Sequence, residues 1–594
     1  MSASRSSEAP SDAHLLGEWA RLCFATLRDA GVRDVWVSPG SRSTPFTWAA
    51  HHTPGLNLRV VVDERSAGFL ALGHTRITGR PCALLCTSGS AAANYFPAVV
   101  EAAAAHLPLI VLTADRPLDV QQAAAAQTID QVKLYGAHVR SFYDLAPSDA
   151  SQGALLGLRR SVAQAVAQAE GPLPGPVHLN LRARKPLEPA PAQNESEHAL
   201  SARVTELLAQ PVARYAPSSL LANDAVREAA RSLSEAASAL IVVGPLPASM
   251  ERLSAPLAAL AERLQAPLFA EAGSQVRFAL AEHDSACPLL DWLWSVPERA
   301  ERLRPEAILC IGHTPTSSAF ERWAAKIPRR IVLAPHGYPD AIGNAALVAS
   351  GDLEPGLSAL LGALNESASP RDGQFLAAVK AEHERCRDLV REAVNARTPA
   401  LSEGPAVKTV VEMLPDGAVL VLGNSLPIRD VDAYVTVAAD IRVVTQRGAN
   451  GIDGLVAGAI GSAVASRVPT LLLIGDVSLR HDLGSLSLLG HAHAPLVIAV
   501  VDNAGGRIFD QLPVQKLYGA DEAASELWLT PPSGDLRHAA ALFGLSYVAP
   551  TTLGGIREAV AAALTDTTPT LLHLRVEPDS AQQLRQSILA ALRG

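Results

Sequence analysis

Two polar turns in the C-terminal part of the chain carry side chains that could hold a metal ion. Asp476 follows one short apolar run, Asn503 follows the next, and the backbone carbonyl of Gly505 comes two residues later. Carboxylate, amide and carbonyl oxygens suit Mg²⁺ or Mn²⁺, and such an ion would bind a diphosphate. Beside them, Gly475 would let the backbone approach a phosphate, and Ser478 could donate to a phosphate oxygen. The alternative is two ordinary turns in which Asp and Asn cap helices.

A glutamate in the N-terminal part is a candidate for proton transfer. Glu64 comes after Asp63, just beyond the largely apolar run 58–62, and stands where a helical pattern begins. A carboxylate in such an apolar setting could exchange a proton with a bound molecule. The alternative is structural: Asp63 would cap the helix, and the helix dipole would favour Glu64 in the first turn.

Arginines in turns that follow apolar runs form a third group. Arginine binds carboxylates and phosphates through two parallel hydrogen bonds, so several of them suggest a site for ligands with several anionic groups. Neutral hydrogen bonds could come from Gln127 and Asn424. Ordinary salt-bridged surface residues are the alternative. The four arginines are Arg42, Arg116, Arg429 and Arg447.

The hydrophobic pattern predicts elements that would bring these residues together. Apolar runs ending in polar turns alternate with helical segments, which is typical of parallel strands joined by helical crossovers. Ligands bind beyond the carboxyl ends of such strands. We predict an α/β fold with three doubly wound parallel-sheet domains in series. The expected parts are a disordered tail (1–14), a first domain (15–185), a linker (186–217), a central domain (218–365), a linker and helix (366–404) and a last domain (405–594).

Composition limits the class of protein. The 594 residues carry a formal net charge of −9, and no basic block suggests nucleic acid or an acidic membrane as a partner. No apolar run is long enough to span a membrane, and the first residues do not resemble a signal peptide. The six cysteines lack C-x-x-C or metal-finger spacing. We expect them to be reduced core residues, which favours a cytoplasmic protein.

Seven phrases in the first and last domains resemble one family. They are SPGSRSTP (38–45), DERSAGFLALG (63–73), CTSGSAAANYFPAVVEA (86–102), LTADRP (112–117), GNSLPIRD (423–430), RGANGIDG (447–454) and DNAGGRIF (502–509). Together they resemble thiamine-diphosphate-dependent enzymes of the pyruvate-decarboxylase and acetolactate-synthase architecture. Among these, they are most similar to the 2-succinyl-5-enolpyruvyl-6-hydroxy-3-cyclohexene-1-carboxylate synthases of menaquinone biosynthesis. The resemblance spans about residues 15–594.

The resemblance implies a pyrimidine-binding first domain, a central Rossmann-like domain and a diphosphate-binding last domain. Glu64 would hydrogen-bond the aminopyrimidine of the cofactor and favour the imino form that removes the C2 proton. Asp476, Asn503 and the Gly505 carbonyl would hold Mg²⁺ (or Mn²⁺), and Ile452 would bend the cofactor. Further implied cofactor contacts are Ser425, Gly475, Ser478 and Ile508. The implied substrate-binding residues are Ser41, Arg42, Arg116, Gln127, Asn424, Arg429 and Arg447.

The implied reaction joins two substrates. The enzyme would decarboxylate 2-oxoglutarate and add the resulting carbanion to isochorismate in a conjugate sense. Both substrates are dicarboxylates, which agrees with the four arginines. The active site would lie between the first domain of one subunit and the last domain of another, so a homo-oligomer is expected.

Two alternatives stay open at this stage. One is another thiamine-diphosphate 2-oxo-acid decarboxylase or an acetolactate-synthase-like carboligase, whose pyruvate pocket would need fewer arginines. The other is a cofactor-binding protein without catalysis, against which Glu64 argues. No role is carried onto the central segment 312–323.

Overall fold

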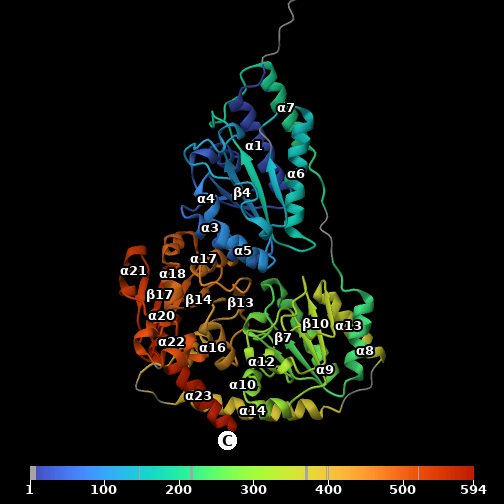
Figure 1. The fold of residues 1–594 in the computed structure, drawn as a ribbon, viewed down its shortest axis with the longest axis vertical. Coiled ribbons are helices and arrows are strands. Elements are labelled where there is room, and N and C mark those ends of the chain that lie inside the picture. The colour runs from blue at the N-terminus through green and yellow to red at the C-terminus, as the bar shows by residue number, and fades with distance from the viewer. Residues whose placement is uncertain are drawn as a thin grey trace, which may run out of the picture. The chain divides into compact units, whose positions relative to one another are not determined.

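The computed structural model describes residues 9–594 except 146–147, 215–218, 368–371, 397, 399 and 520. The chain forms two compact units, Met1–Pro217 with Gly448–Asn450, and Ser218–Arg447 with Gly451–Gly594. The first unit holds one β-sheet and the second holds two (Figure 1). Every strand pairing among the described residues is parallel. The predicted α/β fold with three parallel sheets in series is therefore confirmed.

The sheet of the first unit has the strand order β2-β1-β3-β4-β6-β5. Its strands are β1 (Asp34–Val37), β2 (Asn57–Val60), β3 (Cys82–Cys86), β4 (Leu109–Asp115), β5 (Phe142–Leu145) and β6 (Pro176–Arg182). Its helices are α1 (Asp12–Asp29), α2 (Thr44–His51), α3 (Glu64–Thr78), α4 (Ser90–Asn94), α5 (Phe96–Ala104), α6 (Gln152–Glu170) and α7 (Glu195–Ala209). A short 3-10 helix, η1 (Ser41–Ser43), follows β1.

The central sheet has the order β11-β10-β9-β7-β8. Its strands are β7 (Ala239–Val243), β8 (Leu268–Ala270), β9 (Ala307–Ile311), β10 (Arg329–Ala334) and β11 (Leu347–Ser350). The helices around it are α8 (Asn223–Glu235), α9 (Ser254–Leu264), α10 (Leu290–Trp294), α11 (Pro297–Arg302), α12 (Ser318–Ala324), α13 (Leu353–Ser367) and α14 (Gln374–Asn395).

The last sheet has the order β13-β12-β14-β15-β17-β16. Its strands are β12 (Val419–Leu422), β13 (Arg442–Thr445), β14 (Thr470–Gly475), β15 (Leu496–Asp502), β16 (Ser546–Val548) and β17 (Thr570–Arg575). Its helices are α15 (Glu403–Glu412), α16 (Leu426–Tyr434), α17 (Leu455–Ser466), α18 (Asp476–His481), α19 (Gln515–Tyr518), α20 (Glu526–Leu529), α21 (Leu536–Phe543), α22 (Leu553–Ala563) and α23 (Ser580–Arg593). A 3-10 helix, η7 (Arg507–Gln511), follows the turn after β15.

The unbroken apolar strands are explained by burial on both faces. Successive side chains of a strand point to opposite faces of the sheet. In β7, Ile241 and Val243 pack in one core cluster with helices α8, α9 and α13, while Leu240 and Val242 pack in a second cluster with α10 and α12. All five residues of β7 are buried. A central strand of this kind therefore has no polar face to show in the sequence.

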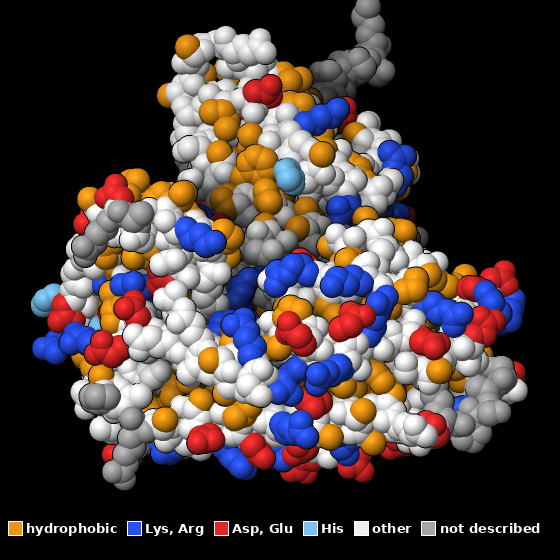
Figure 2. All heavy atoms as spheres, turned by 60° about the horizontal axis from the view of Figure 1, so that its bottom comes forward, with side chains coloured by type: hydrophobic (Ala, Val, Ile, Leu, Met, Phe, Trp, Pro, Cys, Tyr) orange, Lys and Arg blue, Asp and Glu red, His pale blue; other side chains and the backbone are white. Residues whose placement is uncertain are grey.

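The second of these clusters also joins the central and last sheets within the second unit. It includes Ala433 and Tyr434 of α16 and Ile588 and Leu592 of α23. The long helix α14 packs beside α23 and carries ion pairs one turn apart on its outer side. Figure 2, in which the end that carries α14 comes forward, shows acidic and basic side chains interspersed on that face.

Two expected irregular segments contain helices. Residues 1–8 of the expected tail lie outside the described residues, but α1 already begins at Asp12, because the Ser11 side chain accepts a hydrogen bond from the backbone of His14. The expected linker 186–217 contains α7, and Leu200 and Val204 of that helix are buried in the core of the first unit. The Pro and Glu residues that suggested a linker lie before α7 or in its first turn.

All six cysteines lie in the described residues, are buried and form no disulfide, as predicted. No helix among the described residues is long and apolar enough to cross a membrane.

Candidate active site

The two turns of the expected cation site lie side by side at one edge of the last sheet. Strands β14 and β15 are hydrogen-bonded neighbours, so Asp476 and Asn503 follow their adjacent carboxyl ends. The Asp476 carboxylate joins the two turns: one oxygen accepts from the backbone N–H of Val477 at 2.9 Å and the other from that of Gly505 at 2.9 Å. Gly505 has φ +125°, and an added Cβ would lie 2.2 Å from the carbonyl oxygen of Leu529. The turn therefore requires glycine at this position.

Asn503 presents its amide oxygen without a partner. The side chain is 5% exposed, and its Nδ2 donates to Oε2 of Glu403 at 2.9 Å. Its Oδ1 is buried and accepts no hydrogen bond. Buried polar atoms are nearly always paired, so the unpaired oxygen in this turn is suited to bind a cation.

This oxygen set fits a hard divalent cation. Asp476 is 1% exposed, and burial followed by the charge of Asp502 raises the pKa of its carboxyl well above the ordinary value. A positive ion would offset both effects, and the unpaired Oδ1 of Asn503 would complete the set beside it. Asp502 lies within hydrogen-bonding reach of Asp476, and its carboxylate is also 2.7 Å from Nε2 of His573.

Glu403, which holds Asn503, belongs to a buried pair of acids. Its Oε1 and Oδ2 of Asp430 are buried and have no basic or amide partner. The two carboxyls hydrogen-bond each other, which requires one of them to be protonated, and burial raises the pKa of each. Sequence reasoning missed Glu403 because it begins helix α15 and follows no strand.

The two arginines of the second unit lie close together. Burial and then the charge of Arg447 lower the pKa of Arg429, so the guanidinium groups share one environment. Arg429 donates to the carbonyl of Ser425 at 2.7 Å, and Arg447 donates to Oδ1 of Asn424 at 3.3 Å. Asn424 in turn donates to the carbonyls of residues 446 and 451. Two adjacent arginines, one in the helix after β12 and one in the turn after β13, have the chemistry to bind an anionic group.

The central domain contributes a glutamate beside this pair. Glu271 is 1% exposed and accepts from the backbone N–H and the hydroxyl of Thr316 at 2.7 and 2.6 Å. Burial raises its pKa, while the Thr316 hydrogen bonds and the charges of Arg447 and Arg429 act in the opposite direction. Glu271 directly follows β8, so the strand-end rule that found Asp476 could have found it as well.

The remaining expected cofactor residues lie around the same edge of the last sheet. Ser425, between β12 and α16, has φ 73° and ψ −128°, a conformation that only glycine adopts easily. Gly475 ends β14, and Ser478 is buried in α18. Ile452 is half-buried in the loop before α17, and Ile508 is half-buried in η7.

In the first unit, Glu64 begins helix α3 after β2. Asp63 caps this helix by accepting from the backbone N–H groups of Arg65 and Ser66, so the capping interpretation is confirmed for Asp63. Glu64 is half-buried, and its charge acts together with the larger effect of burial to raise the pKa of the Cys86 thiol at the end of β3. Because Asp63 alone caps α3, the carboxylate of Glu64 is not needed for capping and could take part in proton transfer.

The other expected residues of the first unit follow strands β1 and β4, which both pair with β3. Ser41 and Arg42 form η1, and Arg42 donates to the carbonyl of Ala183 at 2.8 Å. Burial and then the charge of Arg116 lower the pKa of Arg42, which shows that these two arginines are close. Gln127 is held by two hydrogen bonds with Ser88.

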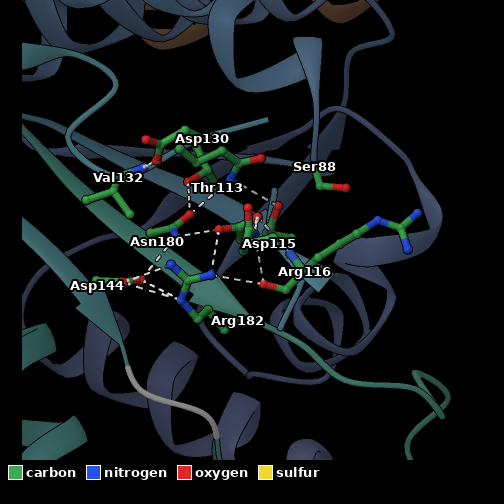
Figure 3. A network of polar contacts seen from close by, with 12 residues as sticks. Ser88, Thr113, Asp115, Arg116, Asp130, Val132, Asp144, Asn180 and Arg182 are labelled. Carbon is green, nitrogen blue, oxygen red and sulfur yellow. Dashed lines mark hydrogen bonds and ion pairs between the residues drawn. The ribbon is translucent and has the colours of Figure 1, made fainter. Parts of the chain in front are cut away.

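A buried polar network fixes the backbone of Arg116 and leaves its side chain free of it (Figure 3). Arg182 donates to Asp115 at 3.1 Å, to Asp144 at 2.9 Å and to the carbonyl of Arg116 at 3.0 Å. The side chain of Arg116 points away from these carboxylates, and its Nε is buried without a hydrogen-bond partner. The carboxylates of Asp115 and Asp144 therefore pair with Arg182 and not with the side chain of Arg116.

The expected site residues thus form two groups. Glu64, Ser41, Arg42, Arg116 and Gln127 lie at one edge of the sheet of the first unit. The others lie at the corresponding edge of the last sheet, in the second unit. Within each group the structure brings the expected residues together.

Comparison with family models gives two matches. Residues 18–134 match "Thiamine pyrophosphate enzyme, N-terminal TPP binding domain", and residues 431–574 match "Thiamine pyrophosphate enzyme, C-terminal TPP binding domain". The first match includes the Glu64 group and the second includes the Asp476 and Asn503 turns.

Several curated proteins are similar along nearly the whole chain. A 2-succinyl-5-enolpyruvyl-6-hydroxy-3-cyclohexene-1-carboxylate synthase of Sorangium cellulosum is 39% identical, with 95% of this chain and 93% of that protein covered. Synthases of the same name from Myxococcus xanthus and Geobacillus kaustophilus are each 36% identical, with 93% of both chains covered.

A solved structure supports the fold. The benzoylformate decarboxylase of Polynucleobacter necessarius matches with a TM-score of 0.69 at 16% identity, over 94% of this chain and 98% of that one.

Proposed function

Because the chain belongs to the family of 2-succinyl-5-enolpyruvyl-6-hydroxy-3-cyclohexene-1-carboxylate synthases, we propose that it decarboxylates 2-oxoglutarate and adds the product to isochorismate. It is a thiamine-diphosphate-dependent enzyme of the decarboxylase and carboligase type. The observation that carries the proposal is the common edge of the last sheet, where an unpaired amide oxygen, a buried carboxylate and two adjacent arginines gather. A diphosphate with its cation and an anionic substrate need such groups together.

In this proposal the turns after β14 and β15 hold the diphosphate. Asp476, Oδ1 of Asn503 and the carbonyl of Gly505 would hold Mg²⁺ or Mn²⁺, and Ser478 would donate to a phosphate oxygen. Support comes from the buried Asp476 and from the unpaired Oδ1 of Asn503. The half-buried side chains of Ile452 and Ile508 supply apolar contacts to the cofactor, and Gly475 and Ser425 supply backbone contacts.

Bound thiamine diphosphate supplies the electron sink that decarboxylation of a 2-oxo acid requires. Glu64 is the residue that would hydrogen-bond a ring nitrogen of the cofactor and exchange a proton with it. A positioned carboxylate is suited to this task, and the helix start at Asp63 fixes where its side chain begins.

The arginines bind the carboxylates of the two substrates. Arg429 and Arg447 form one anionic subsite with Asn424, and Arg42 and Arg116 form another with Ser41 and Gln127. Two observations support this. The two arginines within each pair are close enough for the charge of one to lower the pKa of the other. Nε of Arg116 is buried and has no hydrogen-bond partner. Two separate pairs suit two dicarboxylates better than one monocarboxylate.

The proposal also includes a homo-oligomer whose active site takes the Glu64 group from one subunit and the Asp476 group from another. We place the reaction in the cytoplasm, which the six buried thiols favour.

An assay with thiamine diphosphate, Mg²⁺, 2-oxoglutarate and isochorismate tests the reaction. We expect carbon dioxide from 2-oxoglutarate and the adduct with isochorismate, but little carbon dioxide from pyruvate. A clear preference for pyruvate would replace the proposal by an acetolactate-synthase-like activity.

Calorimetry tests the cation site separately. Asp476→Ala should abolish the Mg²⁺-dependent part of cofactor binding, while the exposed control Asp566→Ala should bind as the wild type does. Unchanged affinity in Asp476→Ala would remove the proposed site.

A further inference from the structure

We infer that Glu403 is the residue that aims the oxygen of Asn503 at the metal ion. The inference rests on the proposed function, which makes Asn503 a metal ligand, and extends it to a residue outside the expected site. The nitrogen and the oxygen of the buried Asn503 amide differ in their hydrogen bonding. Nδ2 has a partner at 2.9 Å, and Oδ1 has none.

An asparagine side chain has two nearly isosteric orientations, and only one of them serves a metal ion. The amide oxygen is a ligand, whereas the NH₂ group is a donor that a cation repels. Rotation by half a turn would exchange the two. Some neighbour must therefore distinguish oxygen from nitrogen at this position.

Glu403 makes this distinction through its Oε2. The remaining oxygen, Oε1, is left for the hydrogen bond with Asp430. An oxygen placed as Oε2 is an acceptor whichever of the two acids carries their shared proton, so it selects the NH₂ end of Asn503. The oxygen of Asn503 is then directed the other way, into the turn with Asp476.

The position of Glu403 is itself well fixed. It is 0% exposed, and its backbone N–H donates to the Ser580 hydroxyl at 3.1 Å. It is the first residue of α15, a helix that packs against α16 and α22. Because Glu403 reaches the turn after β15 through its hydrogen bond with Asn503, we class it as a positioning residue. Groups that orient metal ligands in this way typically change metal affinity by about 10- to 100-fold when removed.

Glu403→Met tests the inference, since methionine fills similar space without an acceptor. With saturating thiamine diphosphate, MnCl₂ is titrated into the protein by calorimetry and by electron paramagnetic resonance of free Mn²⁺. We expect Mn²⁺ affinity to fall at least about 10-fold in Glu403→Met. Glu403→Gln keeps an acceptor oxygen and should stay within about 3-fold of the wild type, which is small beside that effect. Glu412→Met, at the exposed far end of the same helix, is the matched control and should not change the affinity.

Three results would overturn the inference. One is wild-type Mn²⁺ affinity in Glu403→Met. The second is an equal loss in Glu403→Gln, because charge would then matter instead of hydrogen-bond acceptance. If wild-type protein with thiamine diphosphate binds no Mn²⁺, the proposed function fails first, and this result is distinguishable from the other two.

A crystal structure of the wild-type protein with thiamine diphosphate and Mn²⁺ tests the same point if Glu403→Met does not fold. The anomalous signal of Mn²⁺ locates the ion. We expect Oδ1 of Asn503 as a ligand and Glu403 still bonded to Nδ2. Direct ligation of Mn²⁺ by Glu403 would overturn the inference.

Discussion

Glu64 stands where a helix would favour a carboxylate in any case, so its position alone does not identify its role. The structure separates two contributions, since Asp63 forms both capping hydrogen bonds and Glu64 forms neither. The helix therefore needs Asp63 for its start, and Glu64 can be changed with little effect on the helix. This makes a substitution at Glu64 informative about chemistry.

Glu64→Gln should lower kcat by about 10²- to 10⁴-fold, because glutamine keeps the shape but cannot exchange the proton. Mg²⁺-dependent binding of thiamine diphosphate, measured by calorimetry, should be retained. Glu228→Gln on the exposed side of α8 is a control for the same chemical change. Full activity in Glu64→Gln would show that the assigned role is wrong.

The turn between β12 and α16 contains backbone strain next to expected substrate-binding residues. Ser425 precedes α16 and has φ 73° and ψ −128°. One turn into α16, the side chain of Arg429 donates a hydrogen bond to the Ser425 carbonyl. Strain of this kind costs about 1–3 kcal/mol and persists where the surrounding structure enforces it. The neighbouring Asn424 and Arg429 are both expected to bind substrate, so the strained turn sets their spacing.

Ser425→Gly should raise the free energy of unfolding by about 1 kcal/mol, because glycine adopts this conformation without strain. The measurement is the urea-unfolding midpoint without ligands. Ser425→Ala keeps the strain and should not stabilise the protein. Equal midpoints for the glycine and alanine variants would argue against strain at this turn.

Edge strands show what the sequence alone does not predict. Strands β5, β11 and β16 each lie at the edge of a sheet, and none of them has an apolar run that would predict it. They are only partly buried, so they lack the continuous apolar run that identified the central strands. Most of the expected site residues, by contrast, follow strands whose apolar runs are visible in the sequence, which is why they could be proposed before the structure.

Residues that act through other residues are harder to predict. Glu403 is 100 positions from Asn503 in the sequence, and only the packing of α15 brings them together. Glu271 follows a strand and was within reach of the same reasoning, but its proximity to Arg429 and Arg447 depends on how the central and last sheets pack.

The centre of the first sheet carries a histidine that makes stability depend on pH. His178 in β6 is buried, its Nε2 lies 2.7 Å from the Thr113 hydroxyl, and burial lowers its pKa to about 3 from 6.5. Between these values the unfolded chain binds a proton that the folded chain does not. The stabilisation is therefore complete above pH 6.5 and is lost as the pH falls through this window, by up to about 1.4 kcal/mol per pH unit.

His178→Gln should reduce this dependence, because glutamine does not titrate. Urea midpoints at pH 7.5 and 5.5 measure it, and His52→Gln on the exposed end of α2 is the control. The wild type and the control should lose stability more steeply than His178→Gln. An unchanged slope in His178→Gln would assign the dependence to other groups.

The chain as a whole divides its candidate site residues between two compact units, with Glu64 in the first and Asp476 in the second. In the proposed function, the first unit supplies proton exchange and the second unit binds the diphosphate and its cation. The proposed function therefore needs both units, and the expected homo-oligomer takes them from different subunits.

Mixing two inactive variants tests this arrangement. In a symmetric dimer that combines Glu64→Gln with Asp476→Ala, one site receives both changes, and the other receives intact Glu64 from one chain and intact Asp476 from its partner. Random exchange makes about half of the dimers mixed, and each has one intact site of two, so activity should return to about a quarter of the wild-type value. The readout is product formation after the variants are mixed, dissociated in mild denaturant and reassembled. A mixture of Glu64→Gln with itself is the control. If the sites lie within single chains, no exchange of subunits can restore an intact pair, and activity would stay at the level of the separate variants.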